Sequence, residues 1–308
     1  MNTQFFKYAI EVERTRSITQ AAENLYMGQP NLSRAIREME ESLGFPIFER
    51  TSKGVVPTKK GAEFLVYAQN ILVQLEKMDR LSKPDIGNAQ VFSVSIPRAS
   101  YISNGLVEFL KTLNPTQALD IDFQETNSMQ SISNVSEGRH NIAIIRYRLT
   151  NENYFEDYLH NKQLDAETIW EFERVLLLSK DNPYLKDGIV SKADLKQCIE
   201  IVHGDTIVPY HQPGQKNQAK DVVKKFHLYE RANQFEILSN MPNCYMWTSP
   251  IPENYLSRFD LCMAHSTEPG KQYKDVLIYQ KGYKFSALDK RFIDKVYDAN
   301  NQVAFSDF

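Results

Sequence analysis

The sequence has little of what marks secreted, membrane-bound or metal-binding proteins. Its 308 residues include only three cysteines, Cys198, Cys244 and Cys262, which stand far apart and form no CxxC pair. An odd number at this spacing argues against a disulfide framework or a zinc site. No apolar run approaches the ~18 residues of a membrane-spanning helix, and residues 1–13 lack a secretory signal's basic start and long apolar core. We therefore expect a cytoplasmic protein with no membrane association, no metal, no cofactor and buried free thiols; a redox switch is the less favoured alternative.

Catalytic signatures are missing as well. The chain has no P-loop, GxGxxG, HExxH or GxSxG motif. No nucleophile stands beside a base at a meaningful spacing, so we expect no enzyme and no catalytic residues. Scattered histidines and aspartates that converge in three dimensions would be the exception, and an enzyme stays open as an alternative.

What is present begins with residues 17–44, which have the pattern of two short helices joined by a tight turn. Ser17 is suited to cap the first helix, Gly28 to form the corner, Pro30 to start the second helix and Gly44 to end it. Buried positions follow at spacings of three and four residues: Ile18, Ala21, Ala22, Leu25, Leu32, Ala35, Ile36, Met39 and Leu43. A two-stranded hairpin around residues 52–54 comes next. Residues 1–58 are thus predicted to form a winged helix-turn-helix domain.

The exposed start of the second helix carries amide, hydroxyl and arginine side chains, which are residue types suited to contact DNA. Amide side chains pair with adenine, and arginine pairs with guanine or binds phosphate. Residues 14–60 hold eight basic and five acidic residues, a small basic footprint in a chain of net charge −3. A solvated helix face is the alternative. The predicted DNA-contacting residues of the two helices are Ser17, Thr19, Gln29, Pro30, Asn31, Ser33, Arg34 and Arg37.

A long helix is predicted from residue 59 to about 82, within a linker and hinge at 59–88. Its apolar residues, at steps of four and three, are Phe64, Ala68, Ile71, Leu75 and Met78. A mean step of 3.5 residues is typical of a coiled coil, so we predict a dimerisation helix. The alternative is an amphipathic helix packed on its own domain.

Strands alternate with helices in residues 89–308. Strands are predicted at 91–96, 119–125, 141–146, 174–179, 198–203, 234–238 and 276–282, with helices at 105–113, 129–137, 219–226 and 288–297. This alternation predicts parallel sheets in two α/β lobes, with the chain crossing between them near 157–170 and returning near 263–271.

Ligands bind such folds at the carboxyl ends of the strands, in the cleft between the lobes. We expect a small polar or anionic molecule there, held by helix starts, hydroxyls and arginines. Helix caps and a structural histidine are the alternatives for these residue types. The candidate residues are Arg98, Ser100, Tyr101, Thr126, Asn127, Ser128, Arg146, His203 and Thr248.

The segment "FFKYAIEVERTRSITQAAENLYMGQPNLSRAIREMEESLGFPIFERTSKGVVPTKKG" resembles the N-terminal pattern of the LysR-type transcriptional regulators. The rest of the chain fits this family more loosely, through the two-lobed pattern and "SEGRHNIAII", where Asn141 stands at a position that is usually aspartate. Residues 240–256 also depart from the glycine-rich stretch expected there.

The resemblance implies a winged helix-turn-helix joined to a periplasmic-binding-protein-like effector domain. It adds Arg50, Ser52 and Lys53 of the wing as DNA contacts at the minor groove. It also implies a homodimer, assembled into a homotetramer as a dimer of dimers, that binds double-stranded DNA at an inverted repeat and contacts RNA polymerase. The effector is a small molecule of unknown identity. A nonspecific or effector-independent DNA-binding protein and a solute-binding protein are the alternatives.

Overall fold

The computed structural model describes residues 3–51, 54–81, 89–204, 224–229, 231–267 and 270–304. The chain forms two compact units, and the boundary between them falls between residues 88 and 89. Among the described residues, no helix is both long and apolar enough to cross a membrane.

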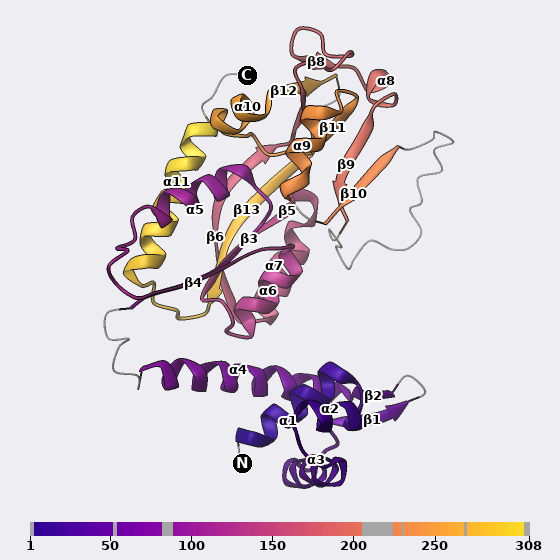
Figure 1. The fold of residues 1–308 in the computed structure, drawn as a ribbon, viewed down its shortest axis with the longest axis vertical. Helices are drawn as coiled ribbons and strands as arrows, with labels where there is room; N and C mark the ends of the chain where they lie inside the picture. Colours follow the sequence, from indigo (N-terminus) through magenta and orange to yellow (C-terminus); the bar gives the residue numbers. More distant parts are fainter. Residues whose placement is uncertain are drawn as a thin grey trace. The chain divides into compact units, whose positions relative to one another are not determined.

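The described part of the N-terminal unit consists of four helices and a two-stranded hairpin, which can be followed in Figure 1. Its elements are α1 (Thr3–Thr15), α2 (Ile18–Asn24), α3 (Gln29–Leu43), β1 (Phe48–Thr51), β2 (Gly54–Pro57) and α4 (Lys59–Leu81). The strands β1 and β2 pair antiparallel and form the wing. The predicted winged helix-turn-helix is confirmed.

Local hydrogen bonds explain where these elements begin and end. The Ser17 hydroxyl caps α2 by accepting a bond from the Gln20 N–H at 3.3 Å. Gly44 ends α3 in the left-handed region, with φ of 75°. The Glu40 carboxylate accepts bonds from the N–H groups of Ile47 and Phe48, at 2.7 and 3.0 Å, and so fixes the path from α3 into the wing.

One core joins the helices of this unit to the start of α4. Small residues permit close approach in it: a Cβ at Gly61 would lie 1.9 Å from the Ile47 carbonyl oxygen. Only glycine fits at this position, which seats α4 against the loop before the wing. The buried residues are Phe6, Ala9, Val12, Ala21, Ala22, Leu32, Ile36, Met39, Ile47, Leu65 and Ala68.

The predicted dimerisation seam on α4 is divided by this core. Ala68 is buried within it, and Phe64 packs against it with its ring centroid 5.9 Å from that of Phe6. These two residues therefore belong to the core of their own unit, as the alternative anticipated for the first part of the helix. The large apolar side chains left exposed on α4 are Tyr67, Ile71 and Met78, at 60%, 41% and 63%, and Leu75 is half-buried.

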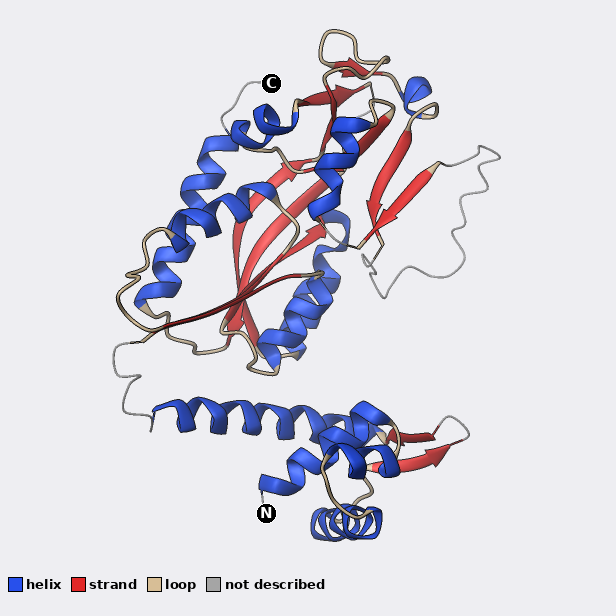
Figure 2. Cartoon of the chain, viewed as in Figure 1, coloured by secondary structure: helices blue, strands red, loops and turns tan. Residues whose placement is uncertain are grey.

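The first lobe of the second unit is a five-stranded sheet in the order β4-β3-β5-β13-β6. Helices cover both of its faces (Figure 2). Its elements are β3 (Gln90–Ile96), α5 (Ser100–Leu110), β4 (Leu119–Glu125), α6 (Ser128–Ser136), β5 (Ile142–Arg148), a 3₁₀ turn (Leu149–Asn151), α7 (Glu152–Asn161), β6 (Leu164–Glu173), β13 (Gln272–Gln280) and α11 (Ala287–Ala304).

The central strand β5 shows why this sheet is covered twice. Ile142 and Ile144 pack with α5 and α11, while Ala143 and Ile145 pack with α6 and α7. A strand buried on both faces appears in the sequence as an unbroken apolar run, which is the pattern of residues 142–145.

The second lobe is a six-stranded sheet in the order β10-β9-β11-β7-β12-β8. Leu177 of β7 packs on one face, and Leu176 and Leu178 pack on the other. Its elements are β7 (Val175–Ser179), β8 (Ile189–Val190), α8 (Lys192–Leu195), β9 (Ile199–His203), β10 (Lys225–Leu228), α9 (Ala232–Asn240), β11 (Cys244–Thr248), α10 (Glu253–Phe259) and β12 (Leu261–Ser266). Together the two lobes confirm the predicted α/β fold class.

Four details differ from the sequence predictions. Both sheets are mixed. In the first lobe β13 runs antiparallel to β5 and β6, and in the second lobe β7 runs antiparallel to β11 and β12. Residues 234–238 are helical in α9, where Phe235 and Leu238 are buried at helical spacing. Lys225 and Phe226 belong to β10 rather than to a helix, and residues 219–223 lie outside the described residues. The first crossing falls at Arg174, after 157–170, which forms α7 and most of β6.

The two crossings between the lobes run side by side. Arg174 donates its N–H to the Lys271 carbonyl at 3.1 Å. A Cβ at Gly270 would lie 2.0 Å from the Arg174 carbonyl oxygen. The outgoing and returning segments therefore form one narrow hinge in which position 270 has no room for a side chain.

Candidate functional site

The start of α3 presents polar side chains to solvent, while its opposite face is buried. Gln29, Pro30, Asn31, Arg34 and Arg37 are exposed. Thr19 is exposed, and Ser17 and Ser33 are half-buried. Because Leu32, Ala35, Ile36 and Met39 are buried, α3 is fixed in rotation and its polar stripe faces outward. The arrangement brings the predicted residues of α3 onto one surface.

The wing adds to this surface less completely. Arg50 is exposed on β1. Ser52 and Lys53 lie outside the described residues. Sequence reasoning missed Tyr26, which is 98% exposed in the turn before α3 with φ of 52°. A large aromatic side chain held out at a helix-turn-helix corner is suited to pack along a DNA backbone.

The second candidate site is a cavity of about 360 Å³ at the ends of strands from both lobes. Eight of the nine predicted ligand residues line it: Arg98, Ser100, Thr126, Asn127, Ser128, Arg146, His203 and Thr248. They come from the loops after β3 and β4, from β5 in the first lobe and from β9 and β11 in the second. This is the cleft that the α/β pattern predicted.

Tyr101 is the predicted cleft residue that the structure places elsewhere. Its ring is 0% exposed in the core of the first lobe, because α5 turns this position inward. Its hydroxyl donates a 2.5 Å hydrogen bond to the Asp275 carboxylate. Burial, and then the charge of Asp275, raises the pKa of Tyr101 well above its ordinary value. Tyr101 thus supports the wall of the cleft from behind.

Arg146 is held by a buried ion pair. Its Nε and Nη2 atoms donate to the two oxygens of Asp275 at 2.7 and 2.6 Å, and its guanidinium lies 4.7 Å from the centroid of the Phe172 ring. Burial alone would lower the pKa of Arg146, but Asp275 raises it above its ordinary value. The fork of bonds fixes the guanidinium in the cleft wall and neutralises most of its charge.

The hydroxyl of Ser100 is used in a bond between the lobes. Arg231, just before α9 in the second lobe, donates to Ser100 Oγ at 2.9 Å and also bonds Ser103 and the Glu125 carboxylate of the first lobe. Arg98 reaches the opposite way and donates to the Tyr229 carbonyl at 3.0 Å. We call these contacts the interlobe bridge. Sequence reasoning missed Arg231, whose partners lie more than 100 residues away along the chain.

Other cleft residues could be found only in the folded chain. Arg148, Arg174 and Tyr273 line the cavity. Arg148 shares a face of β5 with Arg146, because side chains alternate along a strand, so that signal was present in the sequence. Tyr273 reaches the site through its pairing with Arg148 across β13 and β5, and Arg174 through the hinge. Neither has a local pattern that points to the cleft.

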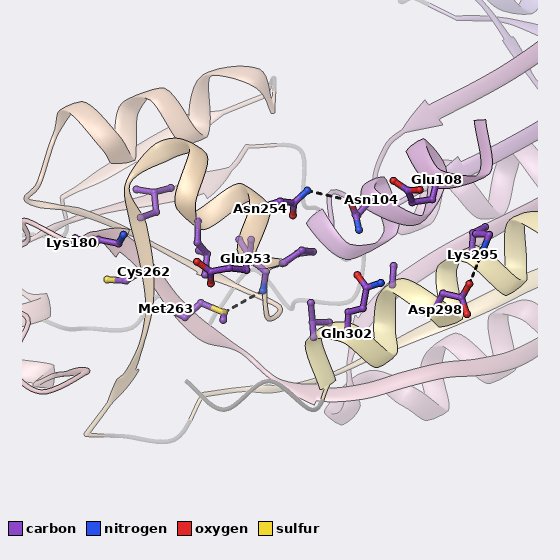
Figure 3. A pocket seen from close by; sticks show the side chains of 16 residues that line it. Asn104, Glu108, Lys180, Glu253, Asn254, Cys262, Met263, Lys295, Asp298 and Gln302 are labelled. Carbon is purple, nitrogen blue, oxygen red and sulfur yellow. Dashed lines mark hydrogen bonds and ion pairs between the residues drawn. The ribbon is translucent and has the colours of Figure 1, made fainter. Parts of the chain in front are cut away.

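A larger cavity of about 700 Å³ lies between α5 and α11 of the first lobe and α10 and β12 of the second. Figure 3 shows Asn104, Glu253 and Gln302 around it. Its floor is apolar, and its rim mixes both signs of charge; Lys295, for example, is paired with Asp298 at 2.8 Å. None of the predicted ligand residues reaches it. The smaller cavity is the better candidate because polar groups from both lobes converge there.

The cysteines offer no chemistry to either cavity beyond packing. Cys198 and Cys244 are buried, and Cys262 is half-buried. Burial raises the pKa of each thiol, which keeps it protonated and poorly reactive. Within the described ranges, no group of three or more His, Cys, Asp or Glu side chains is arranged to hold a metal ion.

The chain thus joins a helix-turn-helix with a wing to a two-lobed α/β unit that contains a polar cleft. Residues 4–62 match the family described as bacterial regulatory helix-turn-helix proteins of the lysR family. The N-terminal unit of this chain is thus similar to the helix-turn-helix domain of that family.

Known relatives agree with this assignment. The chain is 32% identical over 169 residues to the probable cat1 operon transcriptional activator of Acinetobacter lwoffii, a match that covers 53% of this chain and 54% of that protein. The chain thus spans about half the length of the curated relatives it matches.

Solved structures share the fold along almost the whole chain. CbnR, a LysR family transcriptional regulator, is 17% identical with a TM-score of 0.57, covering 97% of this chain and 99% of CbnR. CbnR has also been solved in complex with its target DNA. LysG from Corynebacterium glutamicum, solved with the effector Arg bound, is 11% identical with a TM-score of 0.56, covering 97% and 98% of the two chains. At these identities the likeness shows the fold.

Proposed function

We propose that this protein is a sequence-specific DNA-binding transcription regulator controlled by a small molecule in the cleft between its lobes. One observation carries the proposal. The same chain has an exposed polar face on α3 and, in its second unit, a cavity lined by eight of the predicted ligand residues. It would act in the cytoplasm, on the DNA of the nucleoid. The DNA complex of CbnR and the effector complex of LysG support both halves of the proposal.

DNA recognition would begin at the N-terminal part of α3, placed in the major groove. Gln29 and Asn31 are suited to adenine, and Arg34 to guanine or a phosphate. Arg37, one turn later, is placed for the backbone, and Arg50 of the wing for the adjacent minor groove. The Glu40 carboxylate accepts hydrogen bonds from the Ile47 and Phe48 N–H groups, so we assign it a structural role and no contact with DNA.

The DNA-binding form would be a homodimer, built further into a dimer of dimers. The exposed apolar residues Tyr67, Ile71 and Met78 on α4 give a surface for pairing two copies. This stripe keeps Ile71 and Met78 of the predicted seam and adds Tyr67, because Phe64 and Ala68 are used within the unit. A two-fold dimer would bind an inverted repeat whose half-sites lie one or more helical turns apart.

Control would come from differential binding of the ligand to arrangements of the lobes. A ligand can shift an equilibrium only by its difference in affinity for the two states. In this chain the interlobe bridge and the hinge at Arg174 and Gly270 are the contacts that such a shift would strain or relax. The change would pass to the spacing of the DNA-binding units and to contact with RNA polymerase.

The test is a footprint of the full chain on the DNA upstream of its own gene, at ~150 mM salt with competitor DNA present. We expect protection of an inverted repeat, lost in Arg34→Ala and retained in Lys7→Ala, which removes an exposed positive charge from α1. Binding that is diffuse, steeply salt-dependent and equal in both variants would instead support the nonspecific alternative.

A further inference from the structure

A pair of arginines in the cleft is bound to a neutral group. Arg148 Nε donates to the hydroxyl of Tyr273 at 3.0 Å, and Arg174 Nη1 donates to the same hydroxyl at 3.4 Å. Arg174 also stacks on the Tyr273 ring, 4.8 Å from its centroid, and bonds the Trp247 carbonyl. We call Arg148, Arg174 and Tyr273 the arginine pair site.

The neighbouring arginine shows what the pair site lacks. In the register of β5 and β13, Arg146 stands opposite Asp275, while Arg148 stands opposite Tyr273. Arg146 therefore has a carboxylate and Arg148 has a phenol. Among the described residues, neither Arg148 nor Arg174 has a carboxylate within ion-pair distance. A partly buried positive charge without a counter-ion is costly for a folded chain.

The electrostatics of the groups at this site agree with an excess of positive charge. Burial raises the pKa of Tyr273, but the positive charges of Arg174, Arg148 and Lys271 outweigh it, and the pKa of this phenol falls below its ordinary value. Burial, and then the charges of Arg146 and Arg148, lowers the pKa of Arg174. Arg174 nevertheless remains protonated at neutral pH, because an arginine side chain is not deprotonated in proteins.

The other described residues of the lining do not supply the missing negative charge. Arg98, Lys225 and Lys271 also line the cleft. Within the described part of the lining the one carboxylate is Glu200, and Lys225 already pairs with it at 2.9 Å. Within the described lining, the positive charges of Arg148 and Arg174 are therefore not balanced by an acidic side chain.

We infer that the natural ligand of the cleft is a small organic anion with at least two negative charges, one of whose anionic groups is bound between Arg148 and Arg174. Carboxylate and phosphate groups share the planar or tripodal oxygens that a pair of guanidinium groups binds. The N-terminal turns of α5 and α6, which border the cleft at Ser100 and Ser128, favour a second anionic group. This inference rests on the proposed function, since it assigns a ligand class to the proposed effector cleft.

The experiment uses the full chain and a charge series of probes at constant ionic strength set with chloride. Propionate carries one charge, succinate and sulfate carry two, citrate carries up to three, and succinamide is uncharged. Thermal unfolding and titration calorimetry would be measured for wild type, Arg148→Gln, Arg174→Gln and Arg258→Gln. Arg258 is an exposed arginine on α10 that lines neither cavity, so it is the matched control for loss of one charge.

We expect succinate or citrate to bind wild type at least tenfold more tightly than propionate, with no binding of succinamide. Arg148→Gln and Arg174→Gln should each weaken the multiply charged probes at least tenfold, while Arg258→Gln stays within about twofold of wild type. Without added anion, Arg148→Gln should unfold at or above the wild-type temperature, because it removes like-charge repulsion. A merely structural role for Arg148 would lower that temperature.

Two results overturn the inference. The first is that every anion in the series raises the unfolding temperature of Arg148→Gln and Arg174→Gln as much as that of wild type. The second is that succinamide or propionate binds to wild type as tightly as succinate does. Either result leaves the footprint on DNA untouched, so a protected inverted repeat together with an anion-indifferent cleft would refute the ligand class and retain the regulator. Anion binding without a protected inverted repeat would retain the ligand class and refute the sequence-specific regulator. Phosphoenolpyruvate, compared with succinate, then distinguishes a phosphate from a carboxylate at the pair site.

Discussion

The α3 face and the cleft both present arginines to anions, but they hold them differently. Arg34 and Arg37 are exposed on one helix, whereas Arg146, Arg148 and Arg174 are partly buried in the cleft wall and bonded to Asp275, Tyr273 or a backbone carbonyl. Exposed charges suit a long polyanion that is approached from solvent. Fixed, desolvated charges suit one small molecule in one orientation. The comparison teaches that solvent exposure, more than residue type, separates the two roles.

The largest effect that would test this comparison is that of salt. A protein that contacts six to ten phosphates loses about 10³- to 10⁵-fold in DNA affinity between 50 and 200 mM salt. We expect a loss of this order for the DNA complex, measured by fluorescence anisotropy. Binding of succinate in the cleft should fall less than about tenfold over the same range, because partly buried charges are less screened. Equal salt slopes would abolish the distinction between the two sites.

Removing the counter-ion of Arg146 should have the next largest effect. Asp275→Asn leaves a buried guanidinium without its carboxylate, and we expect the free energy of unfolding to fall by about 3–5 kcal/mol. Both tryptophans, Trp170 and Trp247, lie in the second unit, so urea unfolding followed by tryptophan fluorescence reports on it.

Asp260→Asn is the control for that substitution. Asp260 pairs with Lys180 at 3.2 Å on the surface, and its φ of 54° is one that asparagine also adopts. A loss below about 1 kcal/mol is expected there. If the two variants lose similar amounts of unfolding free energy, burial does not make the Arg146–Asp275 pair more important for stability than a surface pair.

A single base-reading arginine should have a smaller effect than the buried pair. Arg34→Ala is expected to weaken specific binding by about 1–3 kcal/mol and to relax preference at one base pair. Arg37→Ala, on the same helix, should weaken specific and nonspecific DNA alike and reduce the salt slope. Fluorescence anisotropy with specific and scrambled duplexes measures both effects. If Arg37→Ala rather than Arg34→Ala loses base preference, Arg37 reads the base and Arg34 contacts the backbone.

The smallest effect tests whether Ser17 serves structure or DNA. Its hydroxyl already accepts the Gln20 N–H, so Ser17→Ala should destabilise the N-terminal unit by about 1 kcal/mol. Thermal unfolding measures that change. DNA affinity at 25 °C should stay within about threefold of wild type, while Ser17→Asn, which also caps, should restore stability. A large affinity loss in both variants would show a direct contact.

Much of the fold was predictable because its signals are local. Helix caps at Ser17 and Gly44, apolar spacing in α3 and alternation around β5 depend on neighbouring residues, and they predicted the two units. The same local signals placed Ser128 and Arg146 at strand ends, and the structure brings them to one cavity. Residues 234–238 were predicted as a strand because a short apolar run does not distinguish a strand from a buried helix.

The remaining features depend on contacts between distant parts of the chain. The inward rotation of Tyr101 follows from packing of α5, and the use of Phe64 and Ala68 follows from packing on α1, neither of which is visible in apolar spacing. Arg231 reaches Ser100 over 131 residues, and Tyr273 reaches Arg148 over 125. Pairings at that separation are products of the fold, so the most informative residues of the cleft were the least accessible to sequence reasoning.

The hinge has a consequence for how the cleft can be tuned. Arg174 is both the point where the chain leaves the first lobe and a side chain of the arginine pair site, and Gly270 leaves no space beside it. Under the proposed function, binding of an anion at Arg174 would therefore be coupled to the angle between the lobes. By linkage, a change that favours the lobe angle preferred by the anion would raise anion affinity, and a change that disfavours this angle would lower it. Under the proposed function, substitutions at Gly270, which does not line the cavity, should therefore change the affinity of the cleft for its anion.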